Sequence, residues 1–163
     1  MNRKYFIDAN ILITAHRSYY PFDIAPGFWD QFIEKASSKV IFIEKVSDEI
    51  LRGEDQLSDW YQENSANFIL MKIPDTNVIN SYSRIINSIN SNIQYKQSAK
   101  DEFATLADSW LCAYGLAYKH PVLTLEKYQA NSKKRILIPN ICREFKIECI
   151  DLFQFMRETK FKL

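Results

Sequence analysis

The chain has 163 residues, of which 47% are hydrophobic, so it is long enough and apolar enough to bury one core. Its 21 basic and 20 acidic residues leave a formal net charge of +1, which excludes proteins that bind nucleic acid through a strong overall positive field. No apolar run approaches the roughly 18 residues of a membrane span, and the N-terminus does not form an export signal. We therefore expect a single domain, residues 1–163, that works in the cytoplasm without contact with a membrane.

The N-terminal half of the chain predicts strands that are each followed by a helix. Short runs of β-branched and aromatic residues predict strands at 5–7, 40–43 and 68–73. Helical spacing of apolar residues, together with breaks at prolines, predicts helices from residue 10, at 28–36, from residue 47 and around 60–61.

The C-terminal half continues the alternation. Amphipathic spacing predicts helices at 78–93 and 101–118, and a last helix at 151–158. Strands are expected at 122–125 and 148–150, with an apolar stretch at 136–138 before Pro139. Alternating strands and helices form right-handed β-α-β units, so the sequence predicts an α/β fold of three layers, α/β/α, around a central, mainly parallel sheet.

The three cysteines are Cys112, Cys142 and Cys149. Their number is odd, they lack CxxC spacing, and they lie in apolar periodic segments. We interpret them as reduced core residues, which agrees with a reducing compartment.

Four acidic residues are the candidate catalytic and metal-binding groups. Asp8 and Glu126 each follow a predicted strand, which places them at the carboxyl edge of the sheet, where function collects in such folds. Glu49 lies early in the helix after the second strand. Asp108 lies in a mostly apolar helix, where a carboxylate is costly to bury without a cation or donors. Carboxylate oxygens are the ligands that Mg²⁺ and Mn²⁺ prefer, and such ions activate water for attack on phosphodiesters.

Each acid also has a purely structural interpretation. Asp8 can cap a helix, and Glu49 can interact with a helix dipole. Glu126 can be solvated, and Asp108 can be held by structural hydrogen bonds. Because all four acids occur together in this pattern, we favour a shared metal site over four separate structural roles.

The motifs around these acids resemble those of the PIN-domain superfamily of ribonucleases. Residues 5–13 match its first motif, a strand followed by Asp-x-Asn. Glu49 follows a Val-Ser step, Ala107-Asp108 matches the third acid, and Thr124 precedes Glu126 by two positions. Further motifs resemble an uncharacterised PIN-like family of the DUF4411 type and VapC-like toxins: Tyr19-Tyr20-Pro21, Phe28-Trp29, Trp110-Leu111 and Ile138-Pro139-Asn140-Ile141-Cys142.

The resemblance implies a PIN-like fold and a Mg²⁺- or Mn²⁺-dependent endoribonuclease, the toxin of a type II toxin–antitoxin pair with an antitoxin as partner. It assigns Asp8, Glu49, Asp108 and Glu126 to the metal, and Asn10 and Thr124 to hydrogen bonds that orient these ligands. Two features depart from the family pattern. The last acid is Glu where many relatives have Asp, and residues 51–100 match no general PIN motif, so we expect them to shape the substrate groove.

Substrate contacts are expected from a basic stretch directly after the fourth acid. Lys133, Lys134 and Arg135 are the densest cationic run in the chain, and we hypothesise that they bind RNA phosphates; a solvated loop is the alternative. An aromatic cluster follows the first motif and consists of Tyr19, Tyr20, Phe28 and Trp29. We interpret it as core or as a partner interface in preference to a base-stacking surface.

Two other functions compete with the ribonuclease. Asp8, Thr124 and Lys133 faintly match the motifs of haloacid-dehalogenase phosphatases, but Asn10 stands where that chemistry needs a second Asp. The other candidate is a catalytically inactive PIN-like scaffold that binds RNA or protein, although all four acidic positions are filled. A homodimer is a further possibility that the family suggests and no sequence pattern demonstrates.

Overall fold

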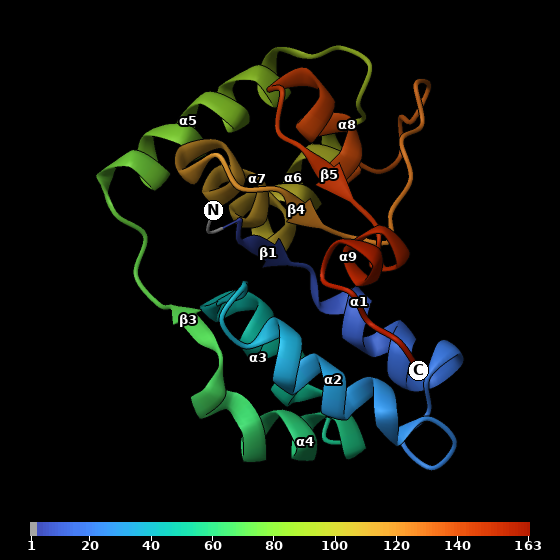
Figure 1. The fold of residues 1–163 in the computed structure, drawn as a ribbon. Helices are drawn as coiled ribbons and strands as arrows, with labels where there is room; N and C mark the ends of the chain where they lie inside the picture. The colour runs from blue at the N-terminus through green and yellow to red at the C-terminus, as the bar shows by residue number, and fades with distance from the viewer. Residues whose placement is uncertain (1–2) are drawn as a thin grey trace.

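The computed structural model describes residues 3–163 and is built around one parallel five-stranded sheet with the order β3-β2-β1-β4-β5 (Figure 1). The strands are β1 (Tyr5–Ile7), β2 (Val40–Ile43), β3 (Ile69–Met71), β4 (Val122–Leu123) and β5 (Cys149–Ile150). The central strand β1 pairs with β2 on one side and with β4 on the other. The predicted α/β fold with a mainly parallel sheet is confirmed.

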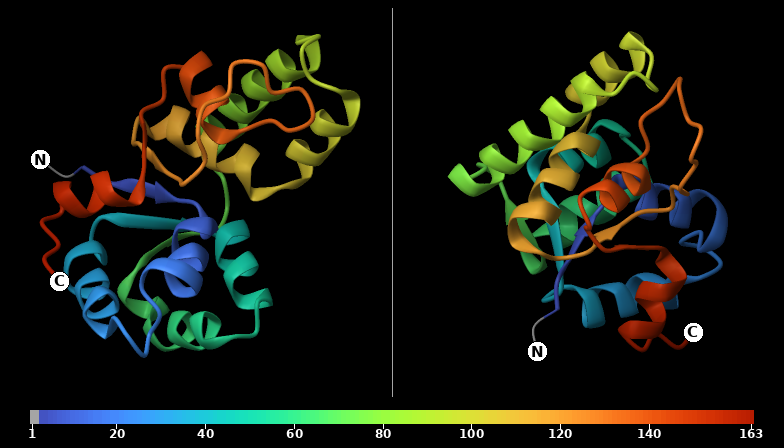
Figure 2. Two further views of the ribbon diagram at one scale, coloured as in Figure 1. Left: turned by 90° about the vertical axis from the view of Figure 1, so that its right-hand side faces the viewer. Right: turned by 90° about the horizontal axis from the view of Figure 1, so that it is seen from above.

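Helices from the N-terminal half cover one face of the sheet (Figure 2). They are α1 (Ala9–Thr14), the π-helical turn η1 (Ala15–Tyr19), α2 (Pro26–Ala36), α3 (Glu44–Arg52), α4 (Gln56–Asn64) and the 3₁₀ turn η2 (Ser65–Asn67). Local sequence explains their starts. Asp55 caps α4 by accepting a hydrogen bond from the Ser58 N–H, 3.0 Å away, while the Ser58 hydroxyl accepts from the Asp55 N–H.

The opposite face carries the helices that connect β3, β4 and β5 (Figure 2). They are α5 (Thr76–Ser91), α6 (Gln97–Thr105), α7 (Ala107–Tyr118) and α8 (Ile138–Glu144). The last helix, α9 (Leu152–Glu158), returns to the first face, where Phe155 packs edge-on against Tyr5. The molecule therefore has the predicted three layers.

Three helix predictions need correction. The continuous helix expected at 101–118 is wrong, because the backbone at Leu106 is extended (φ −89°, ψ 162°) and separates α6 from α7. Apolar residues keep their spacing across the break, so periodicity could not reveal it. Helix α3 begins at Glu44, before the Ser47 start that was expected. The stretch before Pro139 leads into the unpredicted helix α8, since proline is tolerated in a first turn.

The core forms one continuous cluster of buried side chains around the sheet. All residues of β1 and β2 are buried, which is why both strands are continuous apolar runs in the sequence. Helix α7 lies very close to β4: a Cβ added at Gly115 would stand 2.9 Å from a methyl carbon of Val122. Cys112 and Cys142 are buried, as expected for core residues, whereas Cys149 is half-buried; none of the three forms a disulfide.

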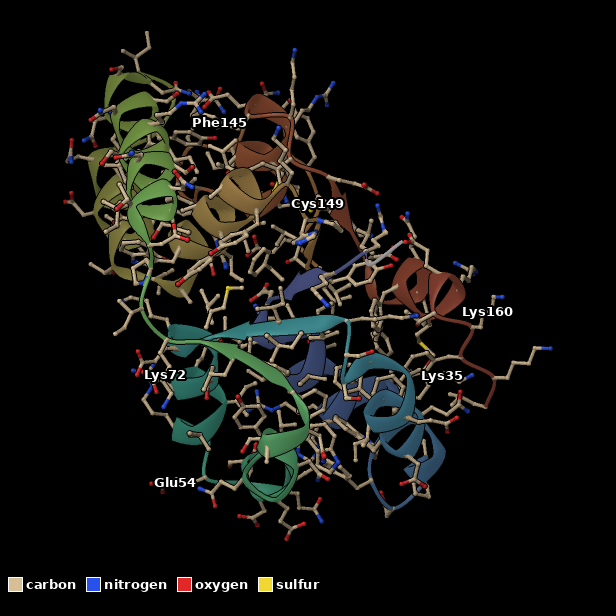
Figure 3. All side chains as sticks on the ribbon, turned by 60° about the vertical axis from the view of Figure 1, so that its left-hand side comes forward. Lys35, Glu54, Lys72, Phe145, Cys149 and Lys160 are labelled. Carbon is tan, nitrogen blue, oxygen red and sulfur yellow. The ribbon has the colours of Figure 1, made fainter. Side chains whose placement is uncertain are left out.

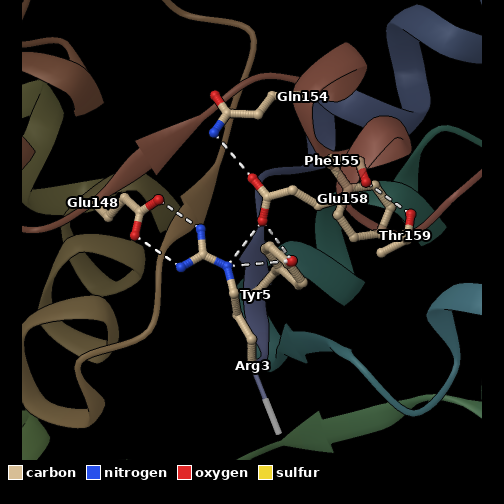
Figure 4. Close-up of polar contacts among 7 residues, drawn as sticks. All are labelled: Arg3, Tyr5, Glu148, Gln154, Phe155, Glu158 and Thr159. Carbon is tan, nitrogen blue, oxygen red and sulfur yellow. Dashed lines mark hydrogen bonds and ion pairs between the residues drawn. The ribbon is translucent and has the colours of Figure 1, made fainter. Parts of the chain in front are cut away.

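A polar network joins the start of β1 to the residue before β5 and to α9, at the amino ends of the strands (Figure 4). The Arg3 guanidinium donates one hydrogen bond to Glu148 Oε1 and one to Glu158 Oε1, each 2.9 Å long. The Tyr5 hydroxyl also donates to Glu158, at 2.9 Å. These ion pairs are largely exposed, so each contributes about 1 kcal/mol or less. Across residues 3–163, no helix combines the length and the apolar character needed to cross a bilayer.

Candidate active site

Asp8 occupies the junction between β1 and α1. It is only 3% exposed, and its side chain accepts the Asn10 backbone N–H at 3.5 Å as the N-cap of α1. Its second carboxylate oxygen accepts a hydrogen bond from the Thr124 hydroxyl, 2.8 Å away. Thr124 follows β4, which pairs with β1, so the two adjacent parallel strands bring Thr124 beside Asp8.

The pKa of Asp8 is raised to about 6, mainly by burial. The hydrogen bond from Thr124 opposes this rise, and the charges of Glu126 and Glu49 contribute to it. The carboxylate is thus kept in surroundings that penalise its negative charge. It needs only a modest rise above pH 6 to ionise, and a nearby cation would favour that form.

Asp108 stands in the first turn of α7, directly after the break at Leu106. It is partly buried, and this burial, reinforced by the charges of Asp8, Glu126 and Glu49, raises its pKa to about 8; Arg135 opposes the shift. Asp108 therefore lies within electrostatic reach of all three other acids. Its position in a first turn places it near the positive end of the α7 dipole.

Glu49 approaches from α3. Burial raises its pKa and the charge of Arg52, on the same helix, opposes the rise. Glu49 and Arg52 line a small cleft together with Ala107, the residue before Asp108. The four predicted acids thus come from four separate segments and interact at one edge of the sheet.

Glu126 differs from the other three acids because its side chain is already bound. One carboxylate oxygen accepts from the Arg135 guanidinium and the other from the Ile138 N–H, each at 2.8 Å. The Glu126 backbone N–H donates to the Thr124 hydroxyl at 3.2 Å, so Thr124 links the acid region to Asp8. The Glu126 side chain is only 11% exposed, whereas that of Arg135 is 52% exposed.

The partnership between Arg135 and Glu126 was not predicted. Arg135 belongs to the basic run that was assigned to RNA, and the structure turns it onto the fourth acid, while Lys133 and Lys134 are exposed. The position of Arg135 nine residues after Glu126 gave no sequence signal, because an irregular connection sets the geometry. The aromatic cluster is core only in part: Phe28 and Trp29 are buried and Tyr20 stacks on Phe28 with ring centroids 4.4 Å apart, whereas Tyr19 is exposed.

The chemistry of these donors suits a hard divalent cation. All four side chains offer carboxylate oxygens, and Asp8 and Asp108 sit where burial makes negative charge costly, a cost that a cation offsets. Within residues 3–163 no three acidic, histidine or cysteine side chains are placed closely enough to hold a metal ion together. The arrangement is a set of carboxylates that interact electrostatically. The Glu126 carboxylate differs from the others because Arg135 and the Ile138 N–H already donate to both of its oxygens.

Comparisons with solved structures agree with the fold. The chain is similar to DNA-bound VapBC from Salmonella typhimurium, with a TM-score of 0.52, 12% identity and coverage of 91% of this chain and 98% of that one. It is also similar to VapBC2 from Rickettsia felis bound to a DNA fragment from the promoter, with a TM-score of 0.50, 9% identity and coverage of 90% and 97%. These likenesses confirm a PIN-like, VapC-like fold.

The sequence itself matches no curated protein. A family model described as "Domain of unknown function (DUF4411)" matches residues 5–163, nearly the whole chain. The chain therefore belongs to the DUF4411 family.

Proposed function

We propose that this protein is a Mg²⁺- or Mn²⁺-dependent endoribonuclease and the toxin of a type II toxin–antitoxin pair. The observation that carries the proposal is that four carboxylates from four segments interact electrostatically at the carboxyl edge of the sheet. Burial raises the pKa of three of them, Asp8, Glu49 and Asp108. In the described part of the chain, none of these three carboxylates forms an ion pair with a basic side chain. Buried, unpaired carboxylates are costly unless they bind a cation.

Asp8, Glu49 and Asp108 would hold the ion, and Glu126 would support the site through its hydrogen bonds. A bound divalent ion orients and activates a water and stabilises charge on the scissile phosphate. The protein supplies the remaining functions. The Thr124 hydroxyl fixes the orientation of the Asp8 carboxylate, and Arg135 places a positive charge beside acids that would otherwise repel the RNA backbone.

The expected partners follow from the same proposal. Lys133 and Lys134 are exposed beyond the fourth acid, where they can contact RNA phosphates. The fold likeness to VapBC assemblies supports an antitoxin as protein partner, and a homodimer in the cytoplasm is part of the same proposal.

The decisive experiment is cleavage of structured and single-stranded RNAs by the wild-type protein in Mn²⁺, Mg²⁺ and EDTA. Asp8→Asn and Asp108→Asn should abolish metal-dependent cleavage, and the matched control Asp59→Asn, an exposed acid on α4, should cleave like wild type. Each removes one negative charge with almost no change in shape, so their difference isolates the site.

Two results would contradict the proposal. Cleavage that persists in EDTA would show that no metal is required. A folded wild-type protein that cuts no RNA with either ion would favour the non-catalytic scaffold.

A further inference from the structure

An apolar cleft of about 120 Å³ opens beside the acidic edge, between the start of α3, the β3–α5 connection and α7. Its lining consists of Ile43, Glu44, Lys45, Lys72, Pro74, Trp110 and Tyr114, and we call it the Trp110 pocket. The Trp110 ring is held rigidly, because it stacks on Tyr82 with centroids 4.0 Å apart and planes 13° from parallel. Tyr82 in turn donates a hydrogen bond to the Ala104 carbonyl.

The Trp110 pocket is continuous with the acidic site through one residue. Lys45 lines both this pocket and the neighbouring cleft, which contains Glu49, Arg52 and Ala107. Lys72 also lines this pocket, on the connection that leads from β3 to α5 (Figure 3). The pocket therefore combines an aromatic wall with two cationic side chains, Lys45 and Lys72.

We propose that the Trp110 pocket binds one unstacked base of a single-stranded RNA, while Lys45 and Lys72 contact the phosphates on either side of it. The inference rests on the proposed ribonuclease function and names the substrate class that its site selects. Alternation of flat apolar surface and positive charge matches the alternation of bases and phosphates along a single strand. A base-paired helix cannot supply the base, because its rings are stacked inside the duplex.

Glu44 gives the pocket a preference among bases. It is the one acidic side chain in the pocket lining, it is exposed, and an ionised carboxylate only accepts hydrogen bonds. It can accept from the exocyclic amino groups of adenine, cytosine and guanine, which uracil lacks. We expect the pocket to bind a base with an amino group more tightly than uracil.

The test is an abasic scan of RNA binding. Fluorescent single-stranded octamers, each lacking one base, are titrated with the full-length protein in EDTA, where the proposed cleavage is off. In wild type, one position should be sensitive, with binding about tenfold weaker when its base is removed. Trp110→Leu should reduce that penalty to below about twofold, and Trp110→Phe, which keeps an aromatic face, should retain most of it.

Matched controls separate the pocket from general effects. Phe153→Leu changes an exposed aromatic side chain on α9, outside the pocket lining, and should leave the scan unchanged. Lys72→Gln should weaken binding of all octamers, whereas Lys39→Gln, an exposed lysine between α2 and β2, should not. Glu44→Gln should narrow the difference between uracil and the amino-bearing bases at the sensitive position. Thermal unfolding of every variant reports whether it is folded.

The outcomes distinguish this inference from the proposed function. A flat scan in a wild-type protein that cleaves RNA would overturn the pocket and leave the ribonuclease intact. A sensitive position that persists in folded Trp110→Leu would show that the base binds elsewhere, which also overturns the pocket. A wild-type protein that neither binds nor cleaves RNA would overturn both.

Discussion

Replacing Asp108 by Asn should make the metal-free protein more stable, although it removes a group that the proposed mechanism needs. In the folded state the pKa of this carboxyl rises from 3.8 to about 8. At about 1.4 kcal/mol per unit, the shift sets an upper limit of about 6 kcal/mol on the cost of keeping it ionised. The other acids contribute part of the shift and the side chain is only partly buried, so we expect about 2–3 kcal/mol.

The sign of the pH dependence follows from where the proton is lost first. The unfolded chain releases the Asp108 proton near pH 4 and the folded chain near pH 8, so the stability of the wild type falls as pH rises between these values. Asn does not titrate, so the variant lacks this contribution. The two proteins should be about equally stable near pH 4, and the variant should gain its full advantage by pH 8.

Urea unfolding in EDTA, at pH values from 4 to 8.5, measures this difference directly. Adding Mg²⁺ at pH 8 should then stabilise the wild type by about 1.4 kcal/mol for each tenfold excess over its dissociation constant, with little effect on the variant. A variant that is less stable than the wild type at pH 8 in EDTA would refute the claim that ionisation of Asp108 destabilises the folded state. Equal Mg²⁺ stabilisation of both proteins would refute its role as a ligand.

Three further predictions concern the surroundings of the site. Thr124→Val removes the hydroxyl that donates to Asp8, so the pKa of Asp8 should rise by up to about one unit, measured by NMR titration. Gly115→Ala should destabilise the fold by about 1–3 kcal/mol in thermal unfolding, because its methyl group would meet Val122 at 2.9 Å; an unchanged melting temperature would contradict this close contact. Replacing Lys133 and Lys134 together by Ala should weaken RNA binding and lower the slope of log K against log salt by about 1–2; a slope like that of wild type would exclude phosphate contacts.

The parts of the fold that the sequence predicted are those where burial alone decides the structure. Strands Tyr5–Ile7 and Val40–Ile43 were located with their correct bounds, because strands buried on both faces read as unbroken apolar runs. The break at Leu106 was missed since it changes only backbone angles and leaves the apolar spacing intact. Helix α8 was missed because only an apolar stretch was predicted before Pro139, whereas this proline lies in the first turn of the helix.

The candidate site shows the same division. The carboxyl edge of the sheet was predicted for Asp8 because it follows a strand, whereas its contact with Thr124 depends on the pairing of β1 with β4, which the sequence did not predict. The contact between Glu126 and Arg135 could not be predicted either, because the loop that joins them has no repeating geometry. The metal role of the four acids stays a prediction until an ion is measured.

The hydrogen bond between Asp8 and Thr124 joins residues that are 116 positions apart in the chain. During synthesis the N-terminal segment leaves the ribosome first, but β1 lies in the middle of the sheet and acquires β4 only when most of the protein exists. Contacts of such long sequence separation also form slowly. A nascent chain therefore carries the first acid without its partners, and the full set of carboxylates assembles only after translation is nearly complete.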